Sequence, residues 1–225
     1  MKVDPMFKPA LTIALIALSA YFACEGHAKA VAEHIYIVPV GDADSKVVAE
    51  IKDKLPSFLS MSSNTLVDPG KDLPESAYDS SRKQYNARVL LKEISRRVTV
   101  DTANERVLLI TDVDLYMPET DFVFGLADAK RGICVISSAR LKDEFYGLKP
   151  NKRAYYNRAL KEAAHELGHS WDLGHCTNPK CVMCLSNTLA DIDKQRDEFC
   201  HACRDKLRLR YEKALVDTKA LMQRW

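Results

Sequence analysis

The segment that most constrains this chain is a histidine-rich stretch, residues 163–169, which reads Ala-Ala-His-Glu-Leu-Gly-His. It lies within a pattern of apolar residues at helical spacing. Residues four apart lie one above the other on a helix face, so His165 and His169 can offer two imidazole nitrogens to one metal ion. Glu166 projects about 100° further round the helix, where it can hold a water molecule beside the metal. The stretch therefore predicts a metal-binding helix.

A third histidine, His175, follows beyond Asp172 and Gly174, where the chain can leave the helix and return to the same metal. Three neutral imidazoles leave one tetrahedral position open for water, which is the arrangement of a catalytic zinc site. Zinc lowers the pKa of such a water to about 7, and Glu166 is the candidate general base for its attack on a carbonyl. The alternative is that the three histidines are exposed at a helix end and bind no metal, and their spacing makes this the weaker interpretation.

The cysteines are crowded, because five of the seven lie between residues 176 and 203. By spacing alone, Cys181-x-x-Cys184 and Cys200-x-x-Cys203 would form an ordinary four-cysteine zinc site, which leaves Cys176 surplus. Each pair could instead close a disulfide in an oxidising compartment. The spacing thus predicts a local site and leaves its chemistry open.

Taken together, the histidine helix and the cysteine-rich segment resemble the archaemetzincin family of metzincin zinc metallopeptidases. The residues that carry the likeness are His165, Glu166, His169, His175, Cys176, Cys181, Met183, Cys200 and Cys203. The likeness extends over about residues 112–207 and includes the runs 111–116 and 122–127. It implies zinc-dependent peptide-bond hydrolysis, as a peptidase or an aminopeptidase. It also implies a single compact metzincin-like α/β domain with a mixed twisted sheet, a zinc-binding active-site helix and a C-terminal zinc-cysteine subregion.

The resemblance also implies a second, structural zinc and hence two zinc ions per chain. Its ligands would be Cys176, Cys181, Cys200 and Cys203. Met183 would form the methionine turn beneath the catalytic zinc. We favour this ligand set over the spacing-based one, because drawing Cys184 toward another metal would compete with the placement of its neighbour Met183.

One residue departs from the family pattern. Asp172 stands where the family has a glycine, three residues after the second histidine. That glycine permits a positive φ at the sharp exit from the helix, a conformation that aspartate tolerates better than most residues. Asp172 favours the alternative of a non-catalytic zinc-binding protein that retains both metal sites, whereas the presence of Glu166 favours an enzyme. A structural module folded around the cysteine site would leave the histidines unexplained.

Strands and helices are expected to alternate along the chain, which favours an α/β fold. Strands are predicted at residues 34–40, 107–113, 122–127 and 132–138. Helices are predicted from residue 44 or 45 to Pro56, over 81–98, from about 151 into the histidine stretch, and over 203–221, with a polar loop over 67–81.

The N-terminus predicts export. Lys2 and Lys8 precede an apolar run at residues 10–24, and Ala28-Lys29-Ala30 has the small-x-small pattern of a cleavage site. We therefore expect residues 1–30 to be a signal peptide and residues 31–225 to be the peptidase domain, secreted or periplasmic. The alternatives are an uncleaved membrane anchor and a lipid-modified Cys24.

Composition excludes several other classes. Hydrophobic residues make up 47% and charged residues 28% of the chain, as in an ordinary globular domain with no stable membrane span in its mature part. With 33 Lys and Arg against 31 Asp and Glu, the net charge of +2 is too small for a surface that follows nucleic acid. The expected partner is a peptide or protein substrate.

Overall fold

The computed structural model describes residues 33–59, 63–67 and 70–210. The expected signal peptide, residues 1–30, and the expected helix beyond residue 210 lie outside this described part. Within it, no helix is long and apolar enough to cross a membrane.

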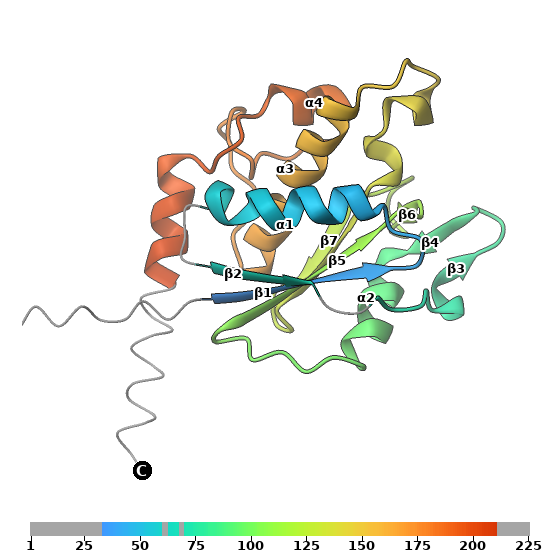
Figure 1. Ribbon diagram of the computed structural model, residues 1–225, viewed down its shortest axis with the longest axis horizontal. Helices are drawn as coiled ribbons and strands as arrows, with labels where there is room; N and C mark the ends of the chain where they lie inside the picture. The colour runs from blue at the N-terminus through green and yellow to red at the C-terminus, as the bar shows by residue number, and fades with distance from the viewer. Residues whose placement is uncertain (1–32, 60–62, 68–69, 211–225) are drawn as a thin grey trace, which may run out of the picture. The chain divides into compact units, whose positions relative to one another are not determined.

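The main sheet has five strands in the order β2-β1-β5-β8-β7 (Figure 1). Its strands are β1 (Glu33–Val40), β2 (Ser63–Val67), β5 (Glu105–Thr111), β7 (Gly125–Asp128) and β8 (Ile133–Ser137). The first four in this order are parallel, and β7 at the edge is antiparallel to β8. Every residue of β8 is buried, as expected of a strand covered on both faces. The mixed α/β sheet is therefore confirmed.

Helices cover both faces of this sheet. They are α1 (Ser45–Leu59), α2 (Ala87–Ser95), α3 (Lys152–Ser170) and α4 (Leu189–Lys194), and residues 201–210 are also helical. Side chains alternate along β5, so that Leu108 packs with α1 and α3 whereas Leu109 packs with α2. The chain thus has two apolar layers, and the histidine helix α3 belongs to the first.

A small second sheet corrects two sequence predictions. It contains β3 (Tyr78–Asp79), β4 (Gln84–Asn86) and β6 (Leu115–Tyr116). The expected loop at residues 67–81 includes β3 and the 3₁₀ helix η1 (Glu75–Ala77). The expected helix at 81–98 begins only at Ala87, because the Asn86 side chain accepts hydrogen bonds from the backbone N–H groups of Arg88 and Val89.

The segment after the histidine helix is held by two buried cations on α3. Arg158 pairs with Asp193 at 2.7 Å and with Asp143, in the 3₁₀ helix η3 (Asp143–Tyr146), at 3.1 Å. Lys161 donates from Nζ to the carbonyl oxygens of Ile192 and Gln195 at 3.1 and 2.8 Å. The preceding 3₁₀ helix η2 (Ala139–Leu141) contributes the Leu141 carbonyl to Arg158. These bonds hold the cysteine-bearing segment against α3.

Candidate metal centre and cleft

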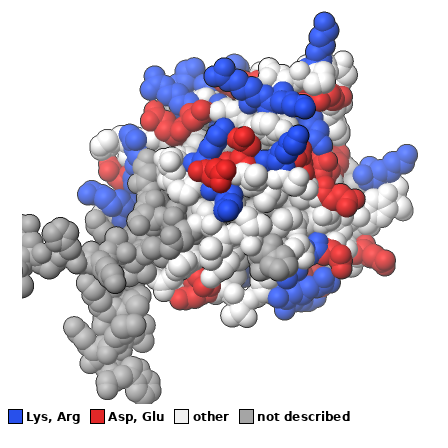
Figure 2. All heavy atoms as spheres, in the orientation of Figure 1, with Lys and Arg blue, Asp and Glu red and all other residues white. Residues whose placement is uncertain are grey.

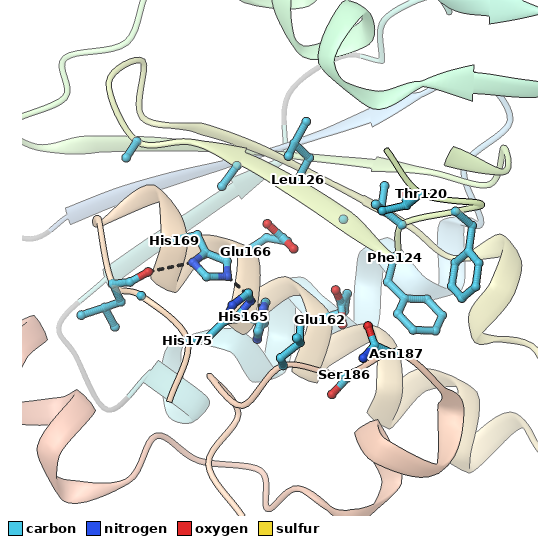
Figure 3. Close-up of a pocket in the computed structure, with 18 of the residues that line it drawn as sticks. Thr120, Phe124, Leu126, Glu162, His165, Glu166, His169, His175, Ser186 and Asn187 are labelled. Atoms are coloured by element: carbon cyan, nitrogen blue, oxygen red, sulfur yellow. Dashed lines mark hydrogen bonds between the residues drawn. The ribbon is translucent and has the colours of Figure 1, made fainter. Parts of the chain in front are cut away.

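Helix α3 brings His165, Glu166 and His169 close together near its C-terminal end. Asn151 caps its N-terminus by accepting a hydrogen bond from the backbone N–H of Ala154. His165 and Glu166 are buried near its C-terminal end. The Nε2 atoms of His165 and His169 are 3.0 Å apart, as the dashed line in Figure 3 marks.

Backbone carbonyls orient both imidazoles. Nδ1 of His165 lies 2.8 Å from the carbonyl oxygen of Val182, and Nδ1 of His169 lies 2.7 Å from that of Leu173. Burial lowers the pKa of His165 to about 3, with a further contribution from the neighbouring His169, and burial also lowers the pKa of His169. Both rings are therefore neutral near pH 7 and donate from Nδ1, which leaves the two Nε2 lone pairs facing each other.

The third histidine joins them through an unusual turn. Asp172 has φ of 63° at the first position past the helix cap. Its backbone N–H donates to the carbonyl of His169, and the N–H of Leu173 donates to that of Gly168, which together form a Schellman motif. The chain then returns His175, so that one nitrogen from each histidine lies within 4.8 Å of the others. Asp172 adopts the conformation for which the family's glycine is expected.

The donor set fits zinc. Tetrahedral zinc with Zn–N distances of about 2.05 Å places two imidazole nitrogens about 3.3 Å apart, close to the 3.0 Å found between His165 and His169. Two facing lone pairs repel unless a cation lies between them. The carbonyl bonds to Nδ1 are also the outer contacts that zinc-binding histidines usually make.

Two carboxyls stand beside the histidines. Glu166 is buried, and its Oε2 atom has no hydrogen-bond partner. Glu162 lies one helical turn earlier on the same side. Burial raises the pKa of Glu162 to about 8, and burial together with Glu162 raises the pKa of Glu166. A buried oxygen without a partner is expected to bind a water or a ligand.

Gly125 allows the edge strand to pass close to Glu166. A Cβ atom at Gly125 would lie 2.5 Å from Cγ of Glu166. A side chain here would thus displace the glutamate, and Gly125 fixes where the edge strand passes the carboxyl.

Met183 lies beneath the histidine helix. Its side chain is fully buried, and a Cβ atom on Gly168 would collide with its sulfur. The adjoining Val182 supplies the carbonyl that orients His165. Met183 therefore packs against α3 at Gly168, next to His169 in the chain.

Four cysteines lie close together. The described residues with sulfur atoms clustered for a metal are Cys176, Cys181, Cys200 and Cys203. The Sγ atoms of Cys176 and Cys200 are 3.7 Å apart. Tetrahedral zinc with Zn–S distances of about 2.3 Å would place sulfurs about 3.8 Å apart, whereas a disulfide bond is about 2.05 Å long. Cys184 is a free cysteine outside this group.

These groups open into a cleft of about 670 Å³ between β7 and α3. Figure 3 shows its two ends: Leu126 and His169 lie toward one end, and Phe124, Ser186 and Asn187 toward the other. The lining includes all three histidines, Glu162 and Glu166. An extended peptide chain can lie along such a cleft next to the edge strand.

Sequence reasoning missed some of this site. It did not single out Glu162, although its spacing of four from Glu166 places both on one helix face. It also missed the carbonyls of Val182 and Leu173, for which no residue type provides a signal because every residue carries a carbonyl.

Comparisons with known proteins agree on one family. The model of peptidase family M54 matches residues 33–209. An archaemetzincin of Methanocaldococcus jannaschii is 40% identical over 173 residues, which are 77% of this chain and 92% of the relative. An archaemetzincin of Pyrococcus furiosus is 40% identical over 186 residues, which are 81% and 96% of the two chains.

Solved structures are similar over the same region. The archaemetzincin of Methanopyrus kandleri has a TM-score of 0.68 at 33% identity, covering 82% of this chain and 98% of that one. A zinc-dependent peptidase of Methanocorpusculum labreanum has a TM-score of 0.69 at 32% identity, covering 77% and 99%. Sequence and fold therefore agree over nearly the whole length of these relatives.

Proposed function

This chain belongs to peptidase family M54, the archaemetzincins, and is a zinc metallopeptidase. We propose that Glu166 is the general base of peptide-bond hydrolysis at a zinc held by three histidines. The zinc ligands would be His165, His169 and His175. The observation that carries the proposal is the convergence of three imidazoles, with one nitrogen of each within 4.8 Å of the others, beside a buried carboxyl oxygen that has no partner.

The chain's own residues can perform the proton transfers. Zinc bound there would supply a Lewis acid for the attacking water and for the scissile carbonyl. Glu166 would hold the water through Oε2 and take its proton. The same carboxyl, once protonated, can deliver the proton to the departing amine.

The edge strand would hold the substrate. β7 pairs with β8 on one side only, so its other side is free to bind an extended peptide. We propose that the substrate runs antiparallel to β7. Residues before the scissile bond would then lie near Leu126, and residues after it near Phe124.

The experiment is a substitution with matched readouts. Glu166→Gln keeps the shape of the side chain but cannot take a proton, so kcat on a quenched peptide library should fall by about 100-fold or more. Zinc content should stay at the wild-type value. Retained turnover in a variant that is fully zinc-loaded would contradict the assignment of Glu166.

Aminopeptidase action is the narrower form of this activity. It requires a free N-terminus on the substrate, so acetylated and free forms of one peptide distinguish it from endopeptidase action. Cleavage of the acetylated peptide at an internal bond would establish the endopeptidase form.

We propose further that Cys176, Cys181, Cys200 and Cys203 bind a second, structural zinc. The sulfur spacing of 3.7 Å supports this, together with the absence of a disulfide among the described cysteines. Elemental analysis should give two zinc ions per chain, and one or none after purification without chelators would contradict the proposal.

Export is also part of the proposal. Its support is the basic start, the apolar run and the Ala28-Lys29-Ala30 pattern in the first thirty residues. N-terminal sequencing of the protein from a cell that exports it should begin at Val31, whereas an intact Met1 terminus in that protein would contradict cleavage.

A further inference from the structure

The cleft is acidic. Its acidic lining residues are Asp121, Glu162, Glu166 and Asp172, and none of the lysines or arginines in the described part of the chain lines it. Asp172 is paired with Arg210 at 2.7 Å, and Glu166 has a role in the proposed chemistry. Glu162 and Asp121 remain as two carboxyl groups without a role in the proposed reaction. They lie in one cleft of a protein whose net charge is close to zero.

Glu162 is the unusual one of these two. Its side chain is only 7% exposed, yet it lines the cleft. Among the described residues no hydrogen bond or ion pair reaches its carboxyl group. Burying a carboxyl without a partner is costly, so this position is more easily explained if a ligand supplies the partner.

The position of Glu162 relative to the scissile bond follows from the helix and the strand. Gly125 passes directly over Glu166, and Glu162 lies one turn earlier, about 6 Å along the α3 axis. Figure 3 shows Glu162 on the side where Phe124 and Asn187 lie, away from Leu126 and His169. If the substrate runs antiparallel to β7, this is the side of the residues that follow the scissile bond.

The walls at this end suit a long side chain with a polar head. Phe124 and Leu185 are apolar, and Ser186 and Asn187 add polar groups. Lysine and arginine bury an aliphatic stem against such surfaces and present a charged end to a polar partner.

One positive charge beside the cleft is already paired. Arg140 stacks on the ring of Phe122 at 4.3 Å from its centroid. Its guanidinium makes two hydrogen bonds to Asp114, at 2.6 and 2.7 Å, so its charge is already paired.

We propose that this end of the cleft is a subsite for a lysine or arginine side chain, on the substrate residue that directly follows the scissile bond, and that Glu162 determines this specificity. The proposal rests on the proposed function, because it takes the direction of the substrate from it. It defines the substrate class as peptides with a basic residue at that position.

The experiment compares peptides that differ at one position only. N-acetylated, internally quenched peptides carry Lys, Arg, norleucine or Glu after the scissile bond, and mass spectrometry maps the cleavage site. Norleucine keeps the stem of lysine but lacks the amine. For the zinc-loaded wild type, kcat/KM for Lys and Arg should exceed that for norleucine by about 10-fold or more, as expected for a buried charged hydrogen bond.

Variants assign the effect to one carboxyl. In Glu162→Gln the ratio of kcat/KM for the Lys peptide to that for the norleucine peptide should fall below about 3-fold, and this ratio is the readout because both peptides meet the same Glu166. Glu162→Asp retains the charge and should restore part of the preference. Glu119→Gln is the matched control, since Glu119 is exposed, pairs with Arg88 and does not line the cleft; it should leave all ratios unchanged.

Each contrary result has a distinct meaning. Equal rates for Lys and norleucine in the wild type would overturn the subsite and leave the proposed function standing. Another contrary result is that removing the acetyl group raises kcat/KM in the wild type and not in Glu162→Gln. That result would mean that Glu162 binds the α-ammonium group of the substrate, which also overturns the proposal. If the zinc-loaded wild type cleaves no peptide, the proposed function fails, and fluorescence anisotropy of the labelled Lys and norleucine peptides on the Glu166→Gln variant then decides the subsite.

Discussion

Asp172 shows how a single backbone angle keeps the metal site intact. Its φ of 63° ends α3 and lets the Leu173 carbonyl reach Nδ1 of His169. Its ion pair with Arg210 joins two exposed side chains and contributes little stability. Conformation is therefore the main requirement at this position, and charge is secondary.

We expect Asp172→Gly to keep the wild-type zinc content and turnover, and to leave the melting temperature the same or slightly higher, because glycine adopts this angle without strain. Asp172→Val should destabilise the fold by about 1–2 kcal/mol, because a β-branched residue resists the left-handed region. Thermal unfolding with zinc analysis checks both. If valine were tolerated as well as glycine, the angle would not be the constraint.

At this scale the sequence could predict the metal-binding side chains but not their partners. His165, His169 and Glu166 follow from helical spacing, which is a property of the sequence alone, whereas His175 is expected from the point where the chain leaves the helix. The family resemblance supplied the expectation that Cys176, and not Cys184, joins the cysteine cluster, and the grouped sulfurs agree with it. The carbonyls that orient the rings depend on how distant segments meet.

Among the elements, β7 determines how a substrate can bind. The N–H of Ser137 donates to the carbonyl of Phe124, and hydrogen-bonded pairs alternate along an antiparallel ladder. Leu126 therefore bonds to β8, and the N–H groups of Gly125 and Ala127 face the free edge. Val123 is also engaged, since its N–H donates to the Leu115 carbonyl at 2.9 Å.

Ala127 is therefore the position at which the proposed posture of the substrate can be tested. Proline there removes an outward donor and keeps the bonds to β8, so KM should rise by about 10-fold while zinc content stays unchanged. Leu126→Pro is the contrasting variant, because it breaks a bond within the sheet and should lower the melting temperature. Steady-state kinetics on one peptide with thermal unfolding distinguish the two, and an unchanged KM in Ala127→Pro would contradict the antiparallel posture.

The long elements were predictable because their signals are local. The apolar spacing of α1 and α3 and the β-branched run of β5 identify them without a partner. The short strands β3, β4 and β6 were missed, since two or three residues carry no periodicity. The sequence also could not predict which N–H groups of β7 face the free edge, because this depends on which residues of β8 lie opposite.

At the scale of the whole molecule, the cysteine site and the catalytic site share one core. The cluster that contains α1, α3 and the sheet also contains Cys181, Cys203 and Met183. The backbone N–H of Cys176 donates to the Met183 carbonyl at 2.8 Å. A zinc on the cysteines would thus hold the segment that lies beneath the histidine cluster, which predicts that a loss of the cysteine-bound zinc also lowers the proposed activity.

Cys176→Ser and Cys184→Ser test this coupling, because they make the same chemical change at two positions of the same segment. Cys176→Ser should lose the cysteine-bound zinc and much of the stability, because a structural zinc contributes on the order of 10 kcal/mol to folding. Its activity should fall further than that of Cys184→Ser, since Cys176 directly follows the ligand candidate His175. Cys184→Ser should keep two zinc ions and the wild-type urea midpoint, because Cys184 lies outside the sulfur cluster. Zinc content, urea unfolding and kcat/KM of both variants provide the check, and equal behaviour of the two would show that the ligand set is wrong.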